Sequence, residues 1–233
     1  VYDPATGEWE PTGPMVVPRL DSTAILLASG KVLVVGGLTT VPQPNPVIPA
    51  TTRSELYDPE ANAWTETKGS LRRPVIWNTL ALLPTGEVLL TNGLPQVYNG
   101  IDPTCRFNAE ADIYDPITEE WRPAHPMLNA HSYPSAVRLP SGRVLLAGGG
   151  LHPGCFTSLS MFPSEVYDPW HDAWAPTPPL RHFEFGAAAA VLLQSGQVLF
   201  TGGETTDFMP WTHWDTLSAA QIFDEGPLPE AVP

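Results

Sequence analysis

The sequence predicts an all-β protein built from one repeated unit of four short strands. The first observation is a nine-residue stretch, Ser29 to Gly37, which has close copies beginning at Thr85, Ser141 and Ser195. Each copy opens with a small residue and a glycine, continues with four or five mostly apolar residues, and ends on Gly-Gly or Asn-Gly. This pattern is typical of a hairpin turn followed by a buried strand. The second observation is that no segment of the repeat has a helical period of useful length.

A Tyr-Asp-Pro motif marks the same repeat. A degenerate copy lies at Phe223-Asp224. The tyrosines of the four full copies, which recur about every 55 residues, are Tyr2, Tyr57, Tyr114 and Tyr167. Seven residues after each tyrosine comes a tryptophan: Trp9, Trp64, Trp121, Trp174. The strands expected in the first complete unit are Thr23 to Leu27, Lys31 to Val35, and those around Tyr57 and Trp64. One domain, 1–233, therefore divides into units of about 2–56, 57–113, 114–166 and 167–223.

Units with a glycine pair, a spaced tyrosine and a spaced tryptophan resemble the kelch repeat of β-propellers, including the galactose-oxidase-like kelch domains. The resemblance covers nearly the whole chain. Asn92-Gly93 replaces Gly-Gly in the second unit, and asparagine tolerates the left-handed backbone that such a turn requires. The resemblance implies four-stranded blades around an axis, with the tyrosines and tryptophans filling the space between blades.

The two ends of the chain predict how the ring closes. The chain starts within the outer hairpin of one unit and ends with three strands of another, Ala187 to Phe223. We expect four blades closed by pairing of the terminal segments, with Gly7 to Glu10 as the missing outer strand. Two alternatives are a fragment of a six- or seven-bladed propeller and a ring completed by two chains.

The long connections are expected on one face of the propeller and the short turns on the other. The long ones join the second and third strands of each unit: Leu38 to Ser54, Leu94 to Ala111, Gly150 to Ser164, Glu204 to Ser218. Binding residues on a rigid scaffold usually lie in such loops. We call this side the long-loop face and predict that any functional site lies there.

Histidines and carboxylates on the long-loop face suggest a metal site. Alignment on the apolar residue before each first strand places Arg19, Val75, His131 and Glu184 at one position, expected around the channel mouth. Glu204, Asp207 and His213 follow the last glycine pair and resemble, in order but not in spacing, the iron ligands of plant specifier proteins. The predicted ligands of a divalent transition metal, iron, copper, zinc or manganese, are His131, His182, Glu184, Glu204, Asp207 and His213. The alternative for each histidine is a solvated or hydrogen-bonded packing group.

Aromatic and charged residues on the same face predict a binding surface for a protein, a peptide or a glycan. Its expected members are Arg19, Asp21, Trp77, Tyr133, His152, Phe185, Trp211 and Trp214. The first functional hypothesis is therefore a binding module. The second is a metal-dependent enzyme of oxidase or lyase type at the channel mouth, with catalytic residues that the sequence does not identify, since nucleophile-elbow, phosphate-loop and metalloprotease motifs are missing.

Two cysteines, Cys105 and Cys155, fall in neighbouring long loops. A disulfide between them is plausible and would place the protein in an oxidising compartment, secreted or periplasmic. Two independent thiols in a cytoplasmic protein are the alternative.

The charge of the chain narrows the range of partners. Its formal net charge is −14, so it has no general attraction for nucleic acid or anionic membrane surfaces. No apolar run approaches the roughly 20 residues that cross a bilayer. We expect a monomer or a small homo-oligomer.

Overall fold

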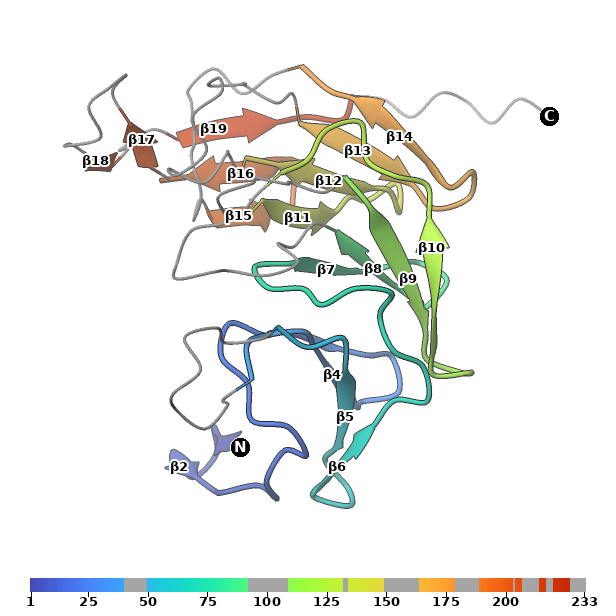
Figure 1. Cartoon of the computed structure of the whole chain (residues 1–233). Coiled ribbons are helices and arrows are strands. Elements are labelled where there is room, and N and C mark those ends of the chain that lie inside the picture. The colour runs from blue at the N-terminus through green and yellow to red at the C-terminus, as the bar shows by residue number, and fades with distance from the viewer. Residues whose placement is uncertain are drawn as a thin grey trace.

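Three four-stranded antiparallel sheets and one three-stranded sheet form the body of the protein (Figure 1). The structure, a computed structural model, describes residues 1–39, 50–91, 109–131, 134–148, 164–178, 189–202 and 220–226, and the backbone of 204–206 and 214–216. Blade 1 contains β3 (Thr23–Leu26), β4 (Val32–Val35), β5 (Ser54–Asp58) and β6 (Ala63–Glu66). Blade 2 contains β7 (Thr79–Leu82), β8 (Val88–Thr91), β9 (Ala111–Asp115) and β10 (Glu120–Ala124).

The later sheets continue this order. Blade 3 contains β11 (Ser135–Arg138), β12 (Val144–Ala147), β13 (Glu165–Asp168) and β14 (Ala173–Pro176). Blade 4 contains β15 (Ala189–Leu192), β16 (Val198–Thr201) and β19 (Ala220–Phe223). Two small hairpins stand apart from the blades, β1 (Tyr2–Asp3) with β2 (Glu8–Trp9) and β17 (Glu204–Thr206) with β18 (Trp214–Thr216).

The repeated motifs form the same local structure in each blade. The glycine of each first turn has a φ between +85° and +88°: Gly30, Gly86, Gly142, Gly196. The tyrosine and tryptophan of each unit lie opposite each other on the two outer strands, as Tyr57 and Trp64 do, and their rings are in contact. The order of strands and the repeat markers are therefore as the sequence predicts.

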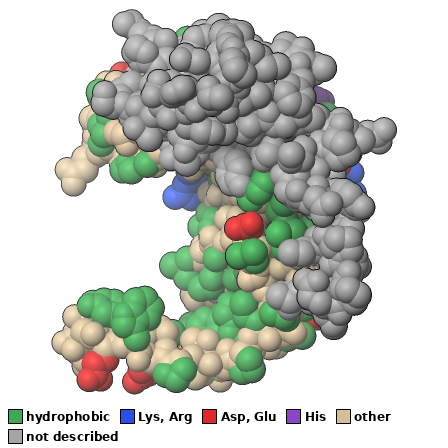
Figure 2. All heavy atoms as spheres, turned by 60° about the vertical axis from the view of Figure 1, so that its left-hand side comes forward, with side chains coloured by type: hydrophobic (Ala, Val, Ile, Leu, Met, Phe, Trp, Pro, Cys, Tyr) green, Lys and Arg blue, Asp and Glu red, His purple; other side chains and the backbone are tan. Residues whose placement is uncertain are grey.

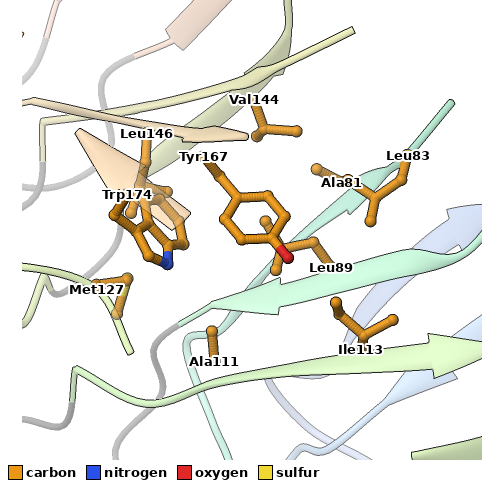
Figure 3. Packing of buried hydrophobic residues seen from close by; sticks show 10 residues of the cluster. All are labelled: Ala81, Leu83, Leu89, Ala111, Ile113, Met127, Val144, Leu146, Tyr167 and Trp174. Atoms are coloured by element: carbon orange, nitrogen blue, oxygen red, sulfur yellow. The ribbon is translucent and has the colours of Figure 1, made fainter. Parts of the chain in front are cut away.

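The hydrophobic core consists of apolar layers between consecutive blades. Between blades 2 and 3, Leu89 and Ile113 pack against Val144, Leu146 and Tyr167. Figure 3 shows the Tyr167 ring pointing from blade 3 toward Leu89 of blade 2. Similar layers join blade 1 to blade 2 and blade 3 to blade 4. Stacking of blades, rather than any single sheet, therefore buries the apolar side chains.

The glycine pair of blade 1 allows close contact with the next blade. Gly36 has a φ of +65°, and a Cβ atom there would lie 2.4 Å from the carbonyl oxygen of Val75. The Gly37 amide donates a hydrogen bond of 2.9 Å to the same oxygen. A side chain at Gly36 would separate the two blades, which explains the glycine in physical terms.

The predicted closure of the ring by the terminal segments is not present. Within the described residues, β2 pairs only with β1 and β19 pairs only with β16. Figure 1 places the N-terminal hairpin and blade 4 at opposite ends of an arc, and the space-filling view shows its open side (Figure 2). The local hairpin closes a short loop, held by the Gly7 amide on the Asp3 carbonyl, at a smaller entropic cost than pairing the two ends of the chain.

In the part of the chain that the structure describes, no residue is helical, and no helix long and apolar enough to cross a membrane is found.

Candidate interaction face

A buried ion pair lies under the long-loop face in blade 1. The Arg19 guanidinium donates hydrogen bonds to Oε1 of Glu55, 2.7 Å from Nη2 and 3.1 Å from Nε. Both side chains are fully buried. The backbone amides of Val16 and Val17 donate to the same carboxylate at 2.8 and 3.1 Å. The carboxylate therefore has enough donors to compensate for the loss of water.

Arg19 also connects the two ends of a long loop. Its Nη1 donates to the carbonyl oxygen of Gly36, before the loop, at 2.7 Å and to that of Arg53, after the loop, at 2.8 Å. One side chain thus joins the segment before β3, the end of β4 and the start of β5. We call this arrangement the loop clasp.

Blade 3 repeats the clasp with a histidine. His131 is 2% exposed, and its Nε2 lies 3.2 Å from Oε1 of Glu165. Its Nδ1 lies 3.1 Å from the carbonyl oxygen of Gly148, the counterpart of Gly36. The amides of Leu128 and Asn129 donate to Glu165 at 2.8 and 2.7 Å, as Val16 and Val17 do to Glu55. His131 therefore does in blade 3 what Arg19 does in blade 1.

Both ring nitrogens of His131 face oxygen atoms. Nδ1 faces the carbonyl oxygen of Gly148, and Nε2 faces the carboxylate of Glu165. Burial of Glu165 raises the pKa of its carboxyl. The hydrogen bonds from His131, Asn129 and Leu128 outweigh this effect and leave that pKa below its ordinary value.

Blade 2 has a looser version of the clasp. The position of Arg19 is taken by Val75, and the carboxylate is the shorter Asp112. Arg72, earlier in the same segment, donates from Nε to Oδ1 of Asp112 at 2.8 Å. Arg73 contacts Glu110 through Nη1, which lies 3.9 Å from Oδ2 of Asp112. Val75, at the position of Arg19, packs against Gly36 and carries no charge. The positive charges beside Asp112 therefore come from Arg72 and Arg73.

The sequence contains a signal for the clasp that residue types alone did not reveal. Glu55, Asp112 and Glu165 each lie two residues before the repeat tyrosine, on an otherwise apolar strand, and each is at most 1% exposed. An acidic residue at a buried strand position needs a partner. The partner, however, lies 34 to 40 residues away and cannot be read from local spacing.

Asp21 and Trp77 occupy equivalent places, two residues before the first strand of blades 1 and 2. Both have a left-handed backbone, with φ of +57° and +55°. Asp21 is exposed and Trp77 is half-buried. They lie on the long-loop face as expected, and their part in binding stays a prediction.

Several predicted site residues lie outside the described residues. They are His152, His182, Glu184, Phe185, Asp207, Trp211, His213, Tyr133 and the two cysteines, Cys105 and Cys155. Glu204 and Trp214 lie in the hairpin of β17 and β18, of which only the backbone is described. Within the described residues no group of three or more His, Cys, Asp or Glu side chains could hold a metal ion. The metal site, the disulfide and the compartment thus stay predictions.

Exposed apolar side chains accompany the clasps on the long-loop face. Val16 and Leu20 of blade 1 are 54% and 58% exposed, and Leu128 before blade 3 is 50% exposed. Leu20 pairs through its backbone with Leu38, at the start of the long loop. These side chains offer apolar contact area next to the fixed ends of the loops.

Comparison with known proteins agrees with this architecture. YjhT, a kelch-type propeller of known structure, superposes with a TM-score of 0.67 at 17% identity over 81% of this chain and 60% of its own. The chain has the fold of a kelch-type β-propeller. It is also similar to Kelch-like protein 25 of Xenopus tropicalis, 30% identical over 115 residues, which are 48% of this chain and 18% of that protein. The chain thus spans less than two thirds of the length of either protein. No protein-family model matches the sequence.

Proposed function

We propose that this propeller is a binding module that takes up a protein or peptide partner on its long-loop face. The observation that carries the proposal is the loop clasp. In blade 1 a single buried arginine joins the carbonyl oxygens of Gly36 and Arg53 at the two ends of one long loop. In blade 3 His131 joins Gly148 to Glu165 across the corresponding loop.

A clasp of this kind keeps the base of a loop in place whatever the sequence of the loop itself. Binding surfaces gain affinity when their supporting residues are ordered before the partner arrives. The exposed Leu20 and Leu128 lie on this face and supply the apolar contact area that protein partners use. The opposite face presents the short turns.

A peptide library displayed on phage provides a test that needs no known partner. The immobilised chain is panned, and the enriched peptides are synthesised and titrated against variants of each face. Leu20→Arg and Leu128→Arg are expected to weaken binding at least tenfold, a loss of about 1.4 kcal/mol per factor of ten. Ile117→Arg is the matched control, because Ile117 is 88% exposed on a short turn of the opposite face.

Circular dichroism and thermal unfolding should show that all three variants fold as the unchanged chain does. Peptides that bind equally well to the two long-loop variants, or that lose binding only with Ile117→Arg, would place the binding surface elsewhere.

A further inference from the structure

An exposed tryptophan, Trp170, lies in the turn between β13 and β14. The turn is held by Asp168, whose Oδ1 accepts a hydrogen bond of 2.9 Å from the Trp170 amide. The outer turns of blades 1 and 2 have the same bond, from the Glu60 amide at 3.0 Å and from the Ile117 amide at 2.8 Å. The position of Trp170 is thus filled by glutamate in one blade and isoleucine in another, so the fold of the turn does not require an indole.

The indole lies against the neighbouring turn of the same blade. Gly142 turns the chain between β11 and β12, and a Cβ atom there would lie 2.5 Å from Cη2 of Trp170 and 2.8 Å from Cγ of Pro84 in blade 2. At the equivalent Gly30 and Gly86, nothing lies within 4 Å of such a Cβ atom. Trp170 is nevertheless 56% exposed, so the supported indole presents an aromatic surface to solvent.

The carboxylates on the adjacent turns are paired with arginines. Oε1 of Glu87, after the turn between β7 and β8, lies 2.9 Å from Nη2 of Arg122. Oε1 of Glu225 accepts a hydrogen bond from Ser141, next to Gly142, and lies 3.1 Å from Nε of Arg143. These two pairs therefore add no net charge beside Trp170.

The turn of Trp170 itself is negatively charged. Among the described residues, neither Asp168 nor Asp172 forms an ion pair with a lysine or an arginine, and Oδ2 of Asp168 lies 2.9 Å from Nδ1 of the exposed His171. Asp172 accepts hydrogen bonds from a hydroxyl group and a backbone amide, both uncharged. Burial raises the pKa of Asp168, but the hydrogen bonds from His171 and the Trp170 amide outweigh it and leave that pKa below its ordinary value.

We propose that the turn between β13 and β14 is a second interaction surface, which binds a protein segment rich in arginine or lysine. One cationic side chain stacks on the exposed indole of Trp170, and a second pairs with the carboxylates of Asp168 and Asp172. The formal net charge of −14 attracts such a segment to the molecule as a whole. This surface belongs to the short turns, opposite the long-loop face, so it is independent of the proposed function.

Fluorescence anisotropy with two labelled peptides of equal length, one alternating Arg-Gly and the other alternating Glu-Gly, tests the proposal. We expect the basic peptide to bind and the acidic peptide not to bind. Trp170→Ala should weaken binding of the basic peptide about fivefold, and Trp170→Phe should weaken it less because an aromatic ring remains. Trp9→Ala is the matched control, because Trp9 is a tryptophan 78% exposed outside this turn, and it should leave the affinity unchanged.

Ionic strength and protein stability complete the test. Raising the salt concentration from about 0.05 M to about 0.5 M should weaken binding of the basic peptide, since exposed charges are then screened. Thermal unfolding should show that the three variants fold as the unchanged chain does. Failure of the basic peptide to bind, equal binding of both peptides, or unchanged affinity in Trp170→Ala would each overturn the proposal, the last by showing that net charge alone attracts the peptide.

Discussion

Nε2 of His131 and Oε1 of Glu165 lie 3.2 Å apart in a fully buried pair. Arg19 and Glu55 form the same contact in blade 1. The two pairs occupy equivalent positions of the repeat, and both are bonded to the carbonyl oxygen of the glycine that ends the second strand. His131 therefore takes the place in the loop clasp of blade 3 that Arg19 takes in blade 1.

Removal of the His131 side chain should destabilise the protein. His131→Ala leaves Glu165 buried with only the donors of Leu128 and Asn129, so we expect a loss of about 3 kcal/mol in the free energy of unfolding. Urea unfolding followed by tryptophan fluorescence measures it. His171→Ala is the control, because its side chain is 78% exposed. Equal stability of the two variants would show that the pair contributes nothing.

Acid should weaken the pair of His131 and Glu165 by protonating the Glu165 carboxylate. The pKa of Glu165 is lower in the folded protein than its ordinary value, despite burial, because His131, Asn129 and Leu128 stabilise the carboxylate. Its contribution to stability is complete above about pH 4.3 and is lost as the pH falls through the lower folded value. Glu165→Gln should show a shallower loss of stability in acid. Glu60→Gln, an exposed turn position, should keep the original slope.

The hydrogen bond from Trp121 to Ser54 should couple blades 1 and 2. Trp121→Phe removes the 3.0 Å bond, and a double-mutant cycle with Ser54→Ala should give a coupling energy of about 1 kcal/mol. Trp64→Phe supplies the comparison, since its Nε1 has no bond to lose in the described structure. Additive effects of Trp121→Phe and Ser54→Ala would argue against the coupling.

Gly36→Ala should be costlier than Gly30→Ala. Both glycines have positive φ, which costs an alanine about 1 to 2 kcal/mol. At Gly36 the new Cβ also meets Val75 of blade 2 at 2.4 Å, whereas nothing lies within 4 Å of a Cβ at Gly30. We expect a loss of about 3 kcal/mol at Gly36, measured by thermal unfolding. Equal melting temperatures of the two variants would show that blades 1 and 2 can move apart to accept a side chain at Gly36 without a measurable loss of stability.

The sequence by itself determined the all-β class, the four-strand repeat and the tyrosine and tryptophan markers, because these depend on local chemistry. Gly30 and its counterparts adopt the turns that glycine allows, and apolar strands alternate with those turns at a fixed spacing. The same strand order predicts that the long connections leave each blade at the same end.

Only the tertiary structure decided what the charged residues do and how the ends lie. Arg19 and His131 meet carboxylates 36 and 34 residues away, on strands that pairing within the same blade brings beside them, so a pattern of loop histidines cannot reveal those partners. Among the described strands, β2 pairs with β1 and β19 pairs with β16, so the terminal strands do not close the ring as the sequence predicted. Partner choice across such separations depends on chain entropy and burial together, which local sequence does not encode.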